Sequence, residues 1–341
     1  MSETIKVEDL NLTRKDFVPG NEVRWCPGCG DYSVLANMQK TLPIMGVKKE
    51  NYAFISGIGC SSRFPYYMDT YGFHSIHGRA PAIASGVKLA NPDLAVWIIT
   101  GDGDGFSIGG NHMIHALRRN IDMNIMLFNN RIYGLTKGQY SPTSLLGKKT
   151  KSSPFGSIDR PFNPSAIALG ANATFIARAL DVDAKGLQES IKRAQRHKGA
   201  SFIEVYQNCI IFNDGEFGDV ENKATRPDNA LFVVHGEPMI FGKDRDKGII
   251  MKDNHPKVVT LGDDWSEDDL LVHDETNQII TNLLLEMTFD THNPTPFGVL
   301  RAVDAPTYDD MLVRQIEEVT EIKGEGTLED LFYSGDVWEV K

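Results

Sequence analysis

Acidic and amide side chains follow two apolar segments of the sequence, with a spacing that suits a metal-bound phosphate. The apolar run 94–100 leads into Gly-Asp-Gly-Asp-Gly, and the apolar run 121–128 leads into a pair of asparagines. Ligands collect at the carboxyl ends of parallel strands in an open α/β sheet, so we expect both segments to end at one site. The glycines let a ligand approach the backbone, and the oxygens of Asp102 and Asn130 suit a hard cation.

A dinucleotide-binding loop is the main alternative for these glycines, and the sequence does not fit it. A G-x-G-x-x-G pattern that starts at Gly101 meets Phe106 at its last position, and one that starts at Gly103 meets Ile108. Two carboxylates would also repel a bare pyrophosphate. Since Mg²⁺ is commonly held by carboxylates together with substrate phosphates, the segment predicts a metal-bridged diphosphate site.

This arrangement resembles the signature of thiamine-diphosphate enzymes, in which Gly-Asp-Gly precedes Asn-Asn by about 25 residues. Here the motif occupies 101–103 and the asparagine pair 129–130. The resemblance implies that Mg²⁺ is held by Asp102, Asn130 and the main-chain carbonyl of Ile132.

The four cysteines form a second group with chemical potential. Cys26 and Cys29 form a CxxC loop ahead of an expected helix, whereas Cys60 and Cys209 follow expected strands at 52–56 and 202–206. A redox dithiol would usually lie between a strand and a helix, and a Cys₄ zinc site would usually use two CxxC pairs. Spacing alone leaves zinc and a [4Fe–4S] cluster open.

Six motifs between residues 24 and 143 resemble, in order, those of the β subunits of 2-oxoacid:ferredoxin oxidoreductases. They are WCPGCG, SGIGCSSR, HGRAPAIASGVKLANPDL, GDGDG, NN and YGLTKGQYSPT. The resemblance implies that Cys26, Cys29, Cys60 and Cys209 ligate a [4Fe–4S] cluster. It also implies thiamine diphosphate and Mg²⁺ as cofactors, coenzyme A as co-substrate, ferredoxin as electron acceptor, and reversible oxidative decarboxylation of a 2-oxoacid.

The same resemblance assigns roles around the cofactor. His77 is expected near the diphosphate, and Leu135 is expected to wall the substrate pocket with Arg63. The residues expected to bind the cofactor are Gly59, Cys60, His77, Gly101, Asp102, Gly103, Asp104, Asn130, Ile132, Gly134 and Leu135. Arginine at position 63 would clamp a second carboxylate in bidentate fashion, which favours 2-oxoglutarate, with pyruvate or a broad 2-oxoacid range as the alternative.

The predicted fold is α/β: the diphosphate-binding half of the thiamine-diphosphate fold, a doubly wound, mostly parallel sheet with helices on both faces. We expect an N-terminal arm at 1–20, the cofactor domain at 21–213, and a partner-contacting extension at 214–341. Further expected elements are a long loop at 135–164, a strand at 171–178, and helices at 80–91, 109–120, 163–171, 184–198, 276–287 and 307–322.

Composition restricts the partners. The formal net charge of −11 argues against nucleic acid or an anionic membrane. No apolar run is long enough to span a bilayer and no signal-peptide pattern is present, so we expect a cytoplasmic protein. Lys148, Lys149 and Lys151 form a local basic cluster that could dock an acidic ferredoxin, although a solvated loop is the simpler interpretation.

A partner subunit is expected because only half of the cofactor site is present. The resemblance implies that an α subunit binds the aminopyrimidine, in an α₂β₂ assembly. Two other classes stay open on sequence: a zinc-stabilised or electron-transfer subunit without its own chemistry, and a non-redox thiamine-diphosphate carboligase, which would not need four thiols.

Overall fold

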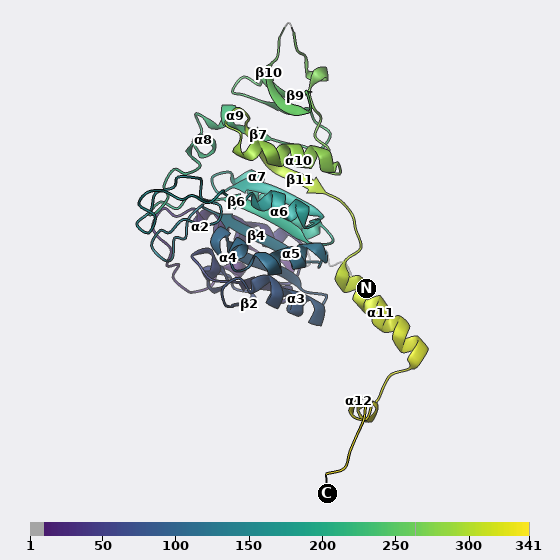
Figure 1. The fold of residues 1–341 in the computed structure, drawn as a ribbon. Coiled ribbons are helices and arrows are strands. Elements are labelled where there is room, and N and C mark those ends of the chain that lie inside the picture. The colour runs from purple at the N-terminus through teal and green to yellow at the C-terminus, as the bar shows by residue number, and fades with distance from the viewer. Residues whose placement is uncertain (1–9, 263, 341) are drawn as a thin grey trace.

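The structure is a computed structural model that describes residues 10–262 and 264–340 (Figure 1). The first nine residues of the arm expected at 1–20 lie outside the described residues. Within the rest of that segment, Arg14–Phe17 forms a short 3-10 helix, and the Phe17 side chain is fully buried in the core.

The centre of the fold is an eight-stranded sheet with the order β2-β1-β3-β4-β6-β5-β11-β7. Six strands run parallel, and β11 pairs antiparallel with β5 and parallel with β7. The strands are β1 (Tyr52–Ser56), β2 (Tyr71–His74), β3 (Ala95–Gly101), β4 (Asn124–Asn129), β5 (Phe175–Leu180), β6 (Ser201–Tyr206), β7 (Ala230–Phe232) and β11 (Thr295–Ala302). This confirms the predicted doubly wound, mostly parallel architecture.

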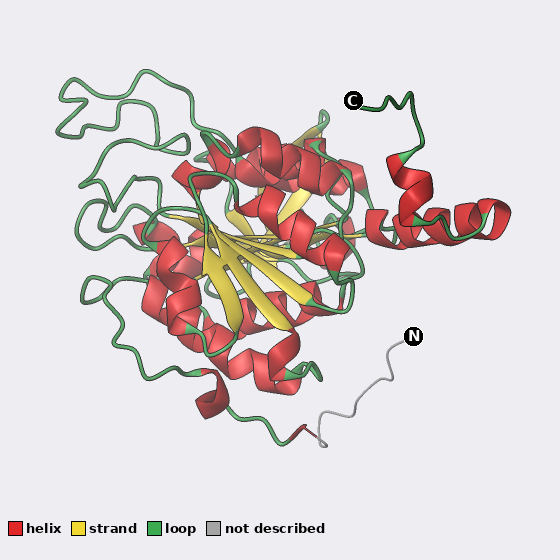
Figure 2. Cartoon of the chain, turned by 90° about the horizontal axis from the view of Figure 1, so that it is seen from below, coloured by secondary structure: helices red, strands yellow, loops and turns green. Residues whose placement is uncertain are grey.

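Helices cover both faces of the sheet (Figure 2). One apolar cluster contains side chains of α2 (Asp31–Thr41) and α7 (Ala184–Arg196). The other contains side chains of α3 (Ala80–Ala90), α5 (Gly110–Arg118), α6 (Pro164–Gly170) and α10 (Gln278–Glu286). Central strands such as β4 and β6 are buried along their whole length, as expected for a sheet packed on both sides.

Two expectations about local structure were wrong. Asp102–Phe106 forms the short helix α4 rather than a loop, so Asp102 is its first residue, directly after β3. The strand expected at 171–178 begins at Phe175, because residues 171–174 form a turn after α6.

The C-terminal part contributes to the central sheet through β7 and β11. It also carries α8 (Gly218–Glu221), α9 (Arg226–Asn229) and a small antiparallel sheet of β8 (Ile240–Phe241), β9 (Lys247–Lys252) and β10 (His255–Thr260). Helices α11 (Tyr308–Lys323) and α12 (Leu328–Phe332) then extend away from the body (Figure 1). None of the helices in the described part of the chain is both long and apolar enough to cross a membrane.

Candidate active site

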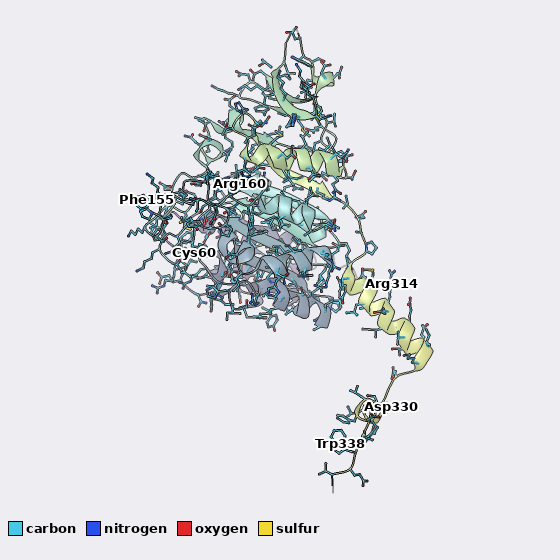
Figure 3. The ribbon with its side chains drawn as sticks, viewed as in Figure 1. Cys60, Phe155, Arg160, Arg314, Asp330 and Trp338 are labelled. Carbon is cyan, nitrogen blue, oxygen red and sulfur yellow. The ribbon has the colours of Figure 1, made fainter. Side chains whose placement is uncertain are left out.

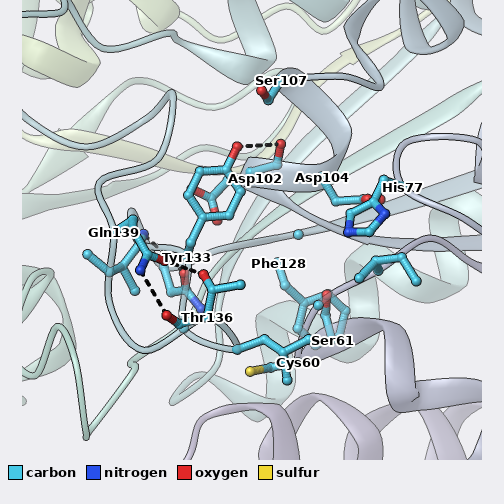
Figure 4. Close-up of a pocket in the computed structure, with 18 of the residues that line it drawn as sticks. Cys60, Ser61, His77, Asp102, Asp104, Ser107, Phe128, Tyr133, Thr136 and Gln139 are labelled. Atoms are coloured by element: carbon cyan, nitrogen blue, oxygen red, sulfur yellow. Dashed lines mark hydrogen bonds between the residues drawn. The ribbon is translucent and has the colours of Figure 1, made fainter. Parts of the chain in front are cut away.

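A cavity of about 500 Å³ opens at the carboxyl ends of β1, β3 and β4 (Figure 4). All eleven residues that the sequence assigned to cofactor binding line it. Four segments far apart in sequence supply them: the residues after β1, the turn after β2 that carries His77, the end of β3 with the start of α4, and the loop after β4. The predicted convergence of these segments at one sheet edge is therefore present in the structure, while the ligands of the individual residues stay a prediction.

Asp102 is a buried carboxyl group in the wall of this cavity, 2% exposed. Its Oδ2 accepts hydrogen bonds from the hydroxyl groups of Ser141 and Thr143, the latter at 2.6 Å. Burial raises the pKa of Asp102, and these hydroxyl groups oppose that rise by stabilising the anion. A buried carboxylate with neutral donors on one oxygen is a favourable ligand for a cation.

Asn130 is held by three hydrogen bonds. Its Oδ1 accepts from the Ile132 amide at 3.2 Å, its Nδ2 donates to Gln207 at 2.8 Å, and its carbonyl accepts from Asn213 at 2.8 Å. Between Asn130 and Ile132, Arg131 has a left-handed backbone with φ of 54°. The loop that presents the two expected magnesium ligands is thus fixed by specific contacts.

Asp104 lines the same cavity, but its oxygens are engaged by neighbouring groups. Oδ1 accepts from the Gly78 amide at 2.7 Å, and Oδ2 accepts from the Thr100 hydroxyl at 3.0 Å. A Cβ atom on Gly57 would lie 1.9 Å from Oδ2, so only glycine fits there. Asp104 therefore secures the turn that follows His77, whose own side chain is exposed in the cavity.

Glycine is also required at position 103. An added Cβ atom would lie 2.1 Å from the Tyr133 ring, and the Tyr133 hydroxyl donates to the Gly103 carbonyl at 3.2 Å. The start of α4 and the loop after β4 therefore touch directly, which brings Asp102 and Asn130 to the same cavity.

A second cavity of about 200 Å³ is lined by all four cysteines. Cys60, Asn130, Gly134 and Leu135 line both cavities, so they form a shared wall. Within the described ranges, no three His, Cys, Asp or Glu side chains converge closely enough to hold one metal ion. Burial raises the pKa of the Cys60 thiol to about 12 and also raises the pKa values of Cys29 and Cys209.

Arg63 and Leu135, the expected substrate-facing residues, occupy different places. Arg63 lines the cysteine cavity, with its guanidinium 5.9 Å from the centre of the Tyr67 ring, and is not part of the lining of the larger cavity. Leu135 lines both cavities and is 52% exposed. The structure therefore does not bring Arg63 and Asp102 to one cavity.

A buried polar network behind the site was not anticipated from the sequence. The first asparagine of the pair, Asn129, donates to Glu204 Oε1 at 2.8 Å, and Glu204 Oε2 accepts from Ser165 at 2.6 Å and from Arg178 at 3.0 Å. The Thr143 hydroxyl lies between Asp102 Oδ2 and the side-chain Oδ1 of Asn129, 3.1 Å from the latter. No spacing rule links these positions, so only the fold shows them as partners.

Glu204→Gln is expected to destabilise the protein by about 3–5 kcal/mol, because it leaves the Arg178 guanidinium, 0% exposed, without its counter-charge. Urea unfolding measures the effect. Glu189→Gln, at an exposed ion pair on α7, is the control and should change stability by less than about 0.5 kcal/mol. An equal, small effect of both changes would contradict a structural role for the buried pair.

Comparisons with known proteins agree with this geometry. Residues 57–205 match the thiamine pyrophosphate enzyme family, C-terminal TPP binding domain. The chain is 51% identical over 330 residues to the 2-oxoglutarate oxidoreductase subunit KorB of Mycobacterium tuberculosis, covering 96% of this chain and 88% of that protein. It is 45% identical over 190 residues to subunit beta of 2-oxoacid:ferredoxin oxidoreductase 1 of Aeropyrum pernix, covering 56% of this chain and 60% of that one.

A solved structure is also similar over nearly the whole chain. The 2-oxoglutarate:ferredoxin oxidoreductase from Magnetococcus marinus, with 2-oxoglutarate, coenzyme A and succinyl-CoA bound, matches with a TM-score of 0.75 and 32% identity. The match covers 95% of this chain and 96% of that one. The chain belongs to the β subunits of the 2-oxoacid:ferredoxin oxidoreductases.

Proposed function

We propose that this β subunit takes part in the coenzyme A-dependent oxidative decarboxylation of 2-oxoglutarate to succinyl-CoA and CO₂, with ferredoxin as electron acceptor. The observation that carries the proposal is the pair of adjacent cavities, one lined by the expected cofactor residues and the other by all four cysteines. Their shared wall would place an oxidisable cofactor adduct next to an electron acceptor. The substrates named for the Magnetococcus marinus enzyme support the substrate assignment.

In the larger cavity, Asp102, Asn130 and the Ile132 carbonyl would hold Mg²⁺, and the buried, hydroxyl-supported carboxylate of Asp102 fits a cation there. Bound thiamine diphosphate would supply the carbon nucleophile and the electron sink. The chain's own contribution is positioning: Asp104 secures the turn beside His77, and the Gly103–Tyr133 contact joins the two segments that carry the metal ligands.

In the smaller cavity, the four cysteines fit a [4Fe–4S] cluster better than the alternatives. A zinc site with four cysteines typically draws them from two CxxC pairs, and the sequence has one such pair. A catalytic dithiol would have a lowered thiol pKa, whereas burial raises the pKa values of Cys29 and Cys60. Such thiols need a metal to deprotonate them.

The role of Arg63 as a clamp for the second carboxylate of 2-oxoglutarate remains part of this proposal. Because Arg63 lines the cysteine cavity, the substrate would have to extend past Leu135, which lines both. Arg63→Met is expected to raise the KM for 2-oxoglutarate roughly tenfold or more, since it removes a charged, bidentate contact. Pyruvate has no second carboxylate, so its KM should change little; equal changes for both substrates would contradict the clamp.

The reaction is tested by anaerobic co-purification of the chain with its α subunit. Viologen reduction is then measured with 2-oxoglutarate or pyruvate, each with coenzyme A. The proposal predicts faster reduction with 2-oxoglutarate and none without coenzyme A. Preference for pyruvate would overturn the substrate, and absence of reduction by any 2-oxoacid would overturn the reaction.

An α subunit is proposed to complete the site, in an α₂β₂ assembly. The loop after β4 exposes large apolar side chains, including Leu146 (64%), Phe155 (97%) and Ile158 (89%). Phe155 lies on the same side of the molecule as Cys60 (Figure 3). Helices α11 and α12 and the following segment expose others, including Ile322 and Trp338. Such apolar surface is typical of contacts with another subunit.

Ferredoxin docking is proposed at the mouth of the cysteine cavity rather than at the lysine cluster. Lys148 pairs with Glu216 at 2.8 Å, which weakens the expected basic patch. The cysteine cavity is instead lined by Arg63, by Lys137 and by Arg24, which pairs with the exposed Glu22 at 2.8 Å. Positive charge next to the electron donor would attract an acidic acceptor and keep the transfer distance short.

The double variant Arg24→Glu and Lys137→Glu is expected to raise the KM for ferredoxin several-fold at low ionic strength, with viologen reduction unchanged. Lys149→Glu with Lys151→Glu is the charge-matched control. A larger rise in the KM for ferredoxin with the control pair would instead place the docking site at the lysine cluster.

A further inference from the structure

The buried side chain of Gln207 contacts one expected ligand of the magnesium ion and one expected ligand of the cluster. Gln207 follows β6 directly and is 1% exposed. Its Oε1 accepts a hydrogen bond from Asn130 Nδ2 at 2.8 Å, and its Nε2 donates to the Cys29 sulfur at 3.3 Å. One amide group therefore links an expected magnesium ligand to an expected cluster ligand.

The orientation of this amide is set by its surroundings. Nε2 faces two acceptors, the Cys29 sulfur and the Asn208 carbonyl at 2.6 Å, which matches its two N–H groups. The reversed amide would place its oxygen against both acceptors and its nitrogen against the Asn130 amide. The backbone of Gln207 is also fixed, because its N–H donates to the Asn129 carbonyl at 3.0 Å.

The CxxC loop packs directly against the residues that follow β6. The Gly30 amide donates to the Asn208 carbonyl at 3.2 Å. A Cβ atom on Gly30 would lie 2.9 Å from Gln207 Cγ and 1.9 Å from Asp181 Oδ2, so the close approach depends on glycine. Gln207 thus has little freedom to leave Cys29.

We infer that Gln207 is a positioning residue that couples the two centres, an inference that rests on the proposed function. Holding Asn130 Nδ2 fixes the orientation of the Asn130 carboxamide, whose oxygen is the expected metal ligand. Removing a hydrogen-bond partner of a metal ligand commonly weakens metal binding 10- to 100-fold. Donation to the Cys29 sulfur favours the more negative, reduced cluster, because hydrogen bonds to cluster sulfurs contribute to its reduction potential.

The test is Gln207→Met in the anaerobically purified α–β complex, which removes the amide at similar length and without a change of charge. Mg²⁺-dependent thiamine diphosphate binding is measured by calorimetry, and the cluster midpoint potential by an EPR-monitored redox titration. The variant is expected to weaken cofactor binding roughly tenfold or more and to shift the midpoint potential to a lower value.

Gln39→Met is the matched control. Gln39 is also buried, 3% exposed, but its side chain bonds to the Tyr67 carbonyl at 3.0 Å and to Arg14 at 3.4 Å, not to an expected metal or cluster ligand. It should leave both readouts unchanged, whatever its effect on thermal stability.

The outcomes distinguish a failure of the proposed function from a failure of the role of Gln207. If the wild-type complex contains zinc or binds no thiamine diphosphate, the proposed function fails. If it holds both cofactors and Gln207→Met changes neither readout, or only to the same extent as Gln39→Met, the coupling role of Gln207 is wrong while the function stands.

Discussion

Replacing Asp102 with asparagine is expected to abolish Mg²⁺-dependent thiamine diphosphate binding and turnover while the protein stays folded. Asp102 supplies the charged ligand of the proposed magnesium site. Its loss should therefore weaken metal binding by more than the 10- to 100-fold that is typical when a hydrogen-bond partner of a metal ligand is changed. Burial raises the pKa of this carboxyl group, so the folded state binds its proton more tightly than the unfolded state. Without metal, the ionised group therefore costs stability as the pH rises above the carboxyl range.

The neutral asparagine removes that cost, so the cofactor-free variant should unfold at the same temperature as the wild type or a higher one near pH 7. Calorimetric cofactor binding and thermal unfolding measure the two effects. Asp309→Asn is the control, because Asp309 is equally buried (2% exposed) but accepts from the Asp122 amide, away from the cavity. Wild-type cofactor affinity in Asp102→Asn would contradict the magnesium assignment.

Cys26→Ala is expected to remove the cluster and with it electron transfer to ferredoxin. Cys26 is the exposed member of the four cysteines and lines only the smaller cavity. Its loss should therefore leave thiamine diphosphate binding close to the wild-type value. Iron and acid-labile sulfide content, visible absorbance and ferredoxin reduction measure the effect. Turnover with ferredoxin should fall below about 1% of the wild-type rate, since the sequence has four cysteines and the proposed cluster uses all of them.

Asn21→Ala, in the same exposed segment, is the control and should retain iron, sulfide and activity. Full iron content in Cys26→Ala would mean that this cysteine is not a ligand.

The sequence was most informative where short motifs end buried strands. The residues at Gly59–Cys60, 101–104 and 130–135 come together because β1, β3 and β4 are neighbours and end at one edge. The same reasoning brought Cys60 and Cys209 to the CxxC loop. The cytoplasmic location expected from composition stays a prediction.

What the sequence could not predict are contacts between single polar residues far apart in the chain. Ser141 and Thr143 support Asp102 from the long loop, and Gln207 reaches Cys29 across 178 positions. Such pairs follow no periodicity or spacing rule. β11 was missed for a related reason: its pairing with β5 has a register shift and a glycine at φ 111°, which obscure a strand pattern.

The most direct test is EPR spectroscopy of the anaerobic α–β complex after addition of 2-oxoglutarate and coenzyme A. The two cavities share a wall formed by Cys60, Asn130, Gly134 and Leu135. If decarboxylation in the larger cavity supplies electrons to a cluster in the smaller one, a reduced [4Fe–4S] signal should develop with substrate. The same signal should be missing in Cys26→Ala. A spectrum that does not respond to substrate in an enzyme with full iron, or an equal signal in the variant, would contradict the account.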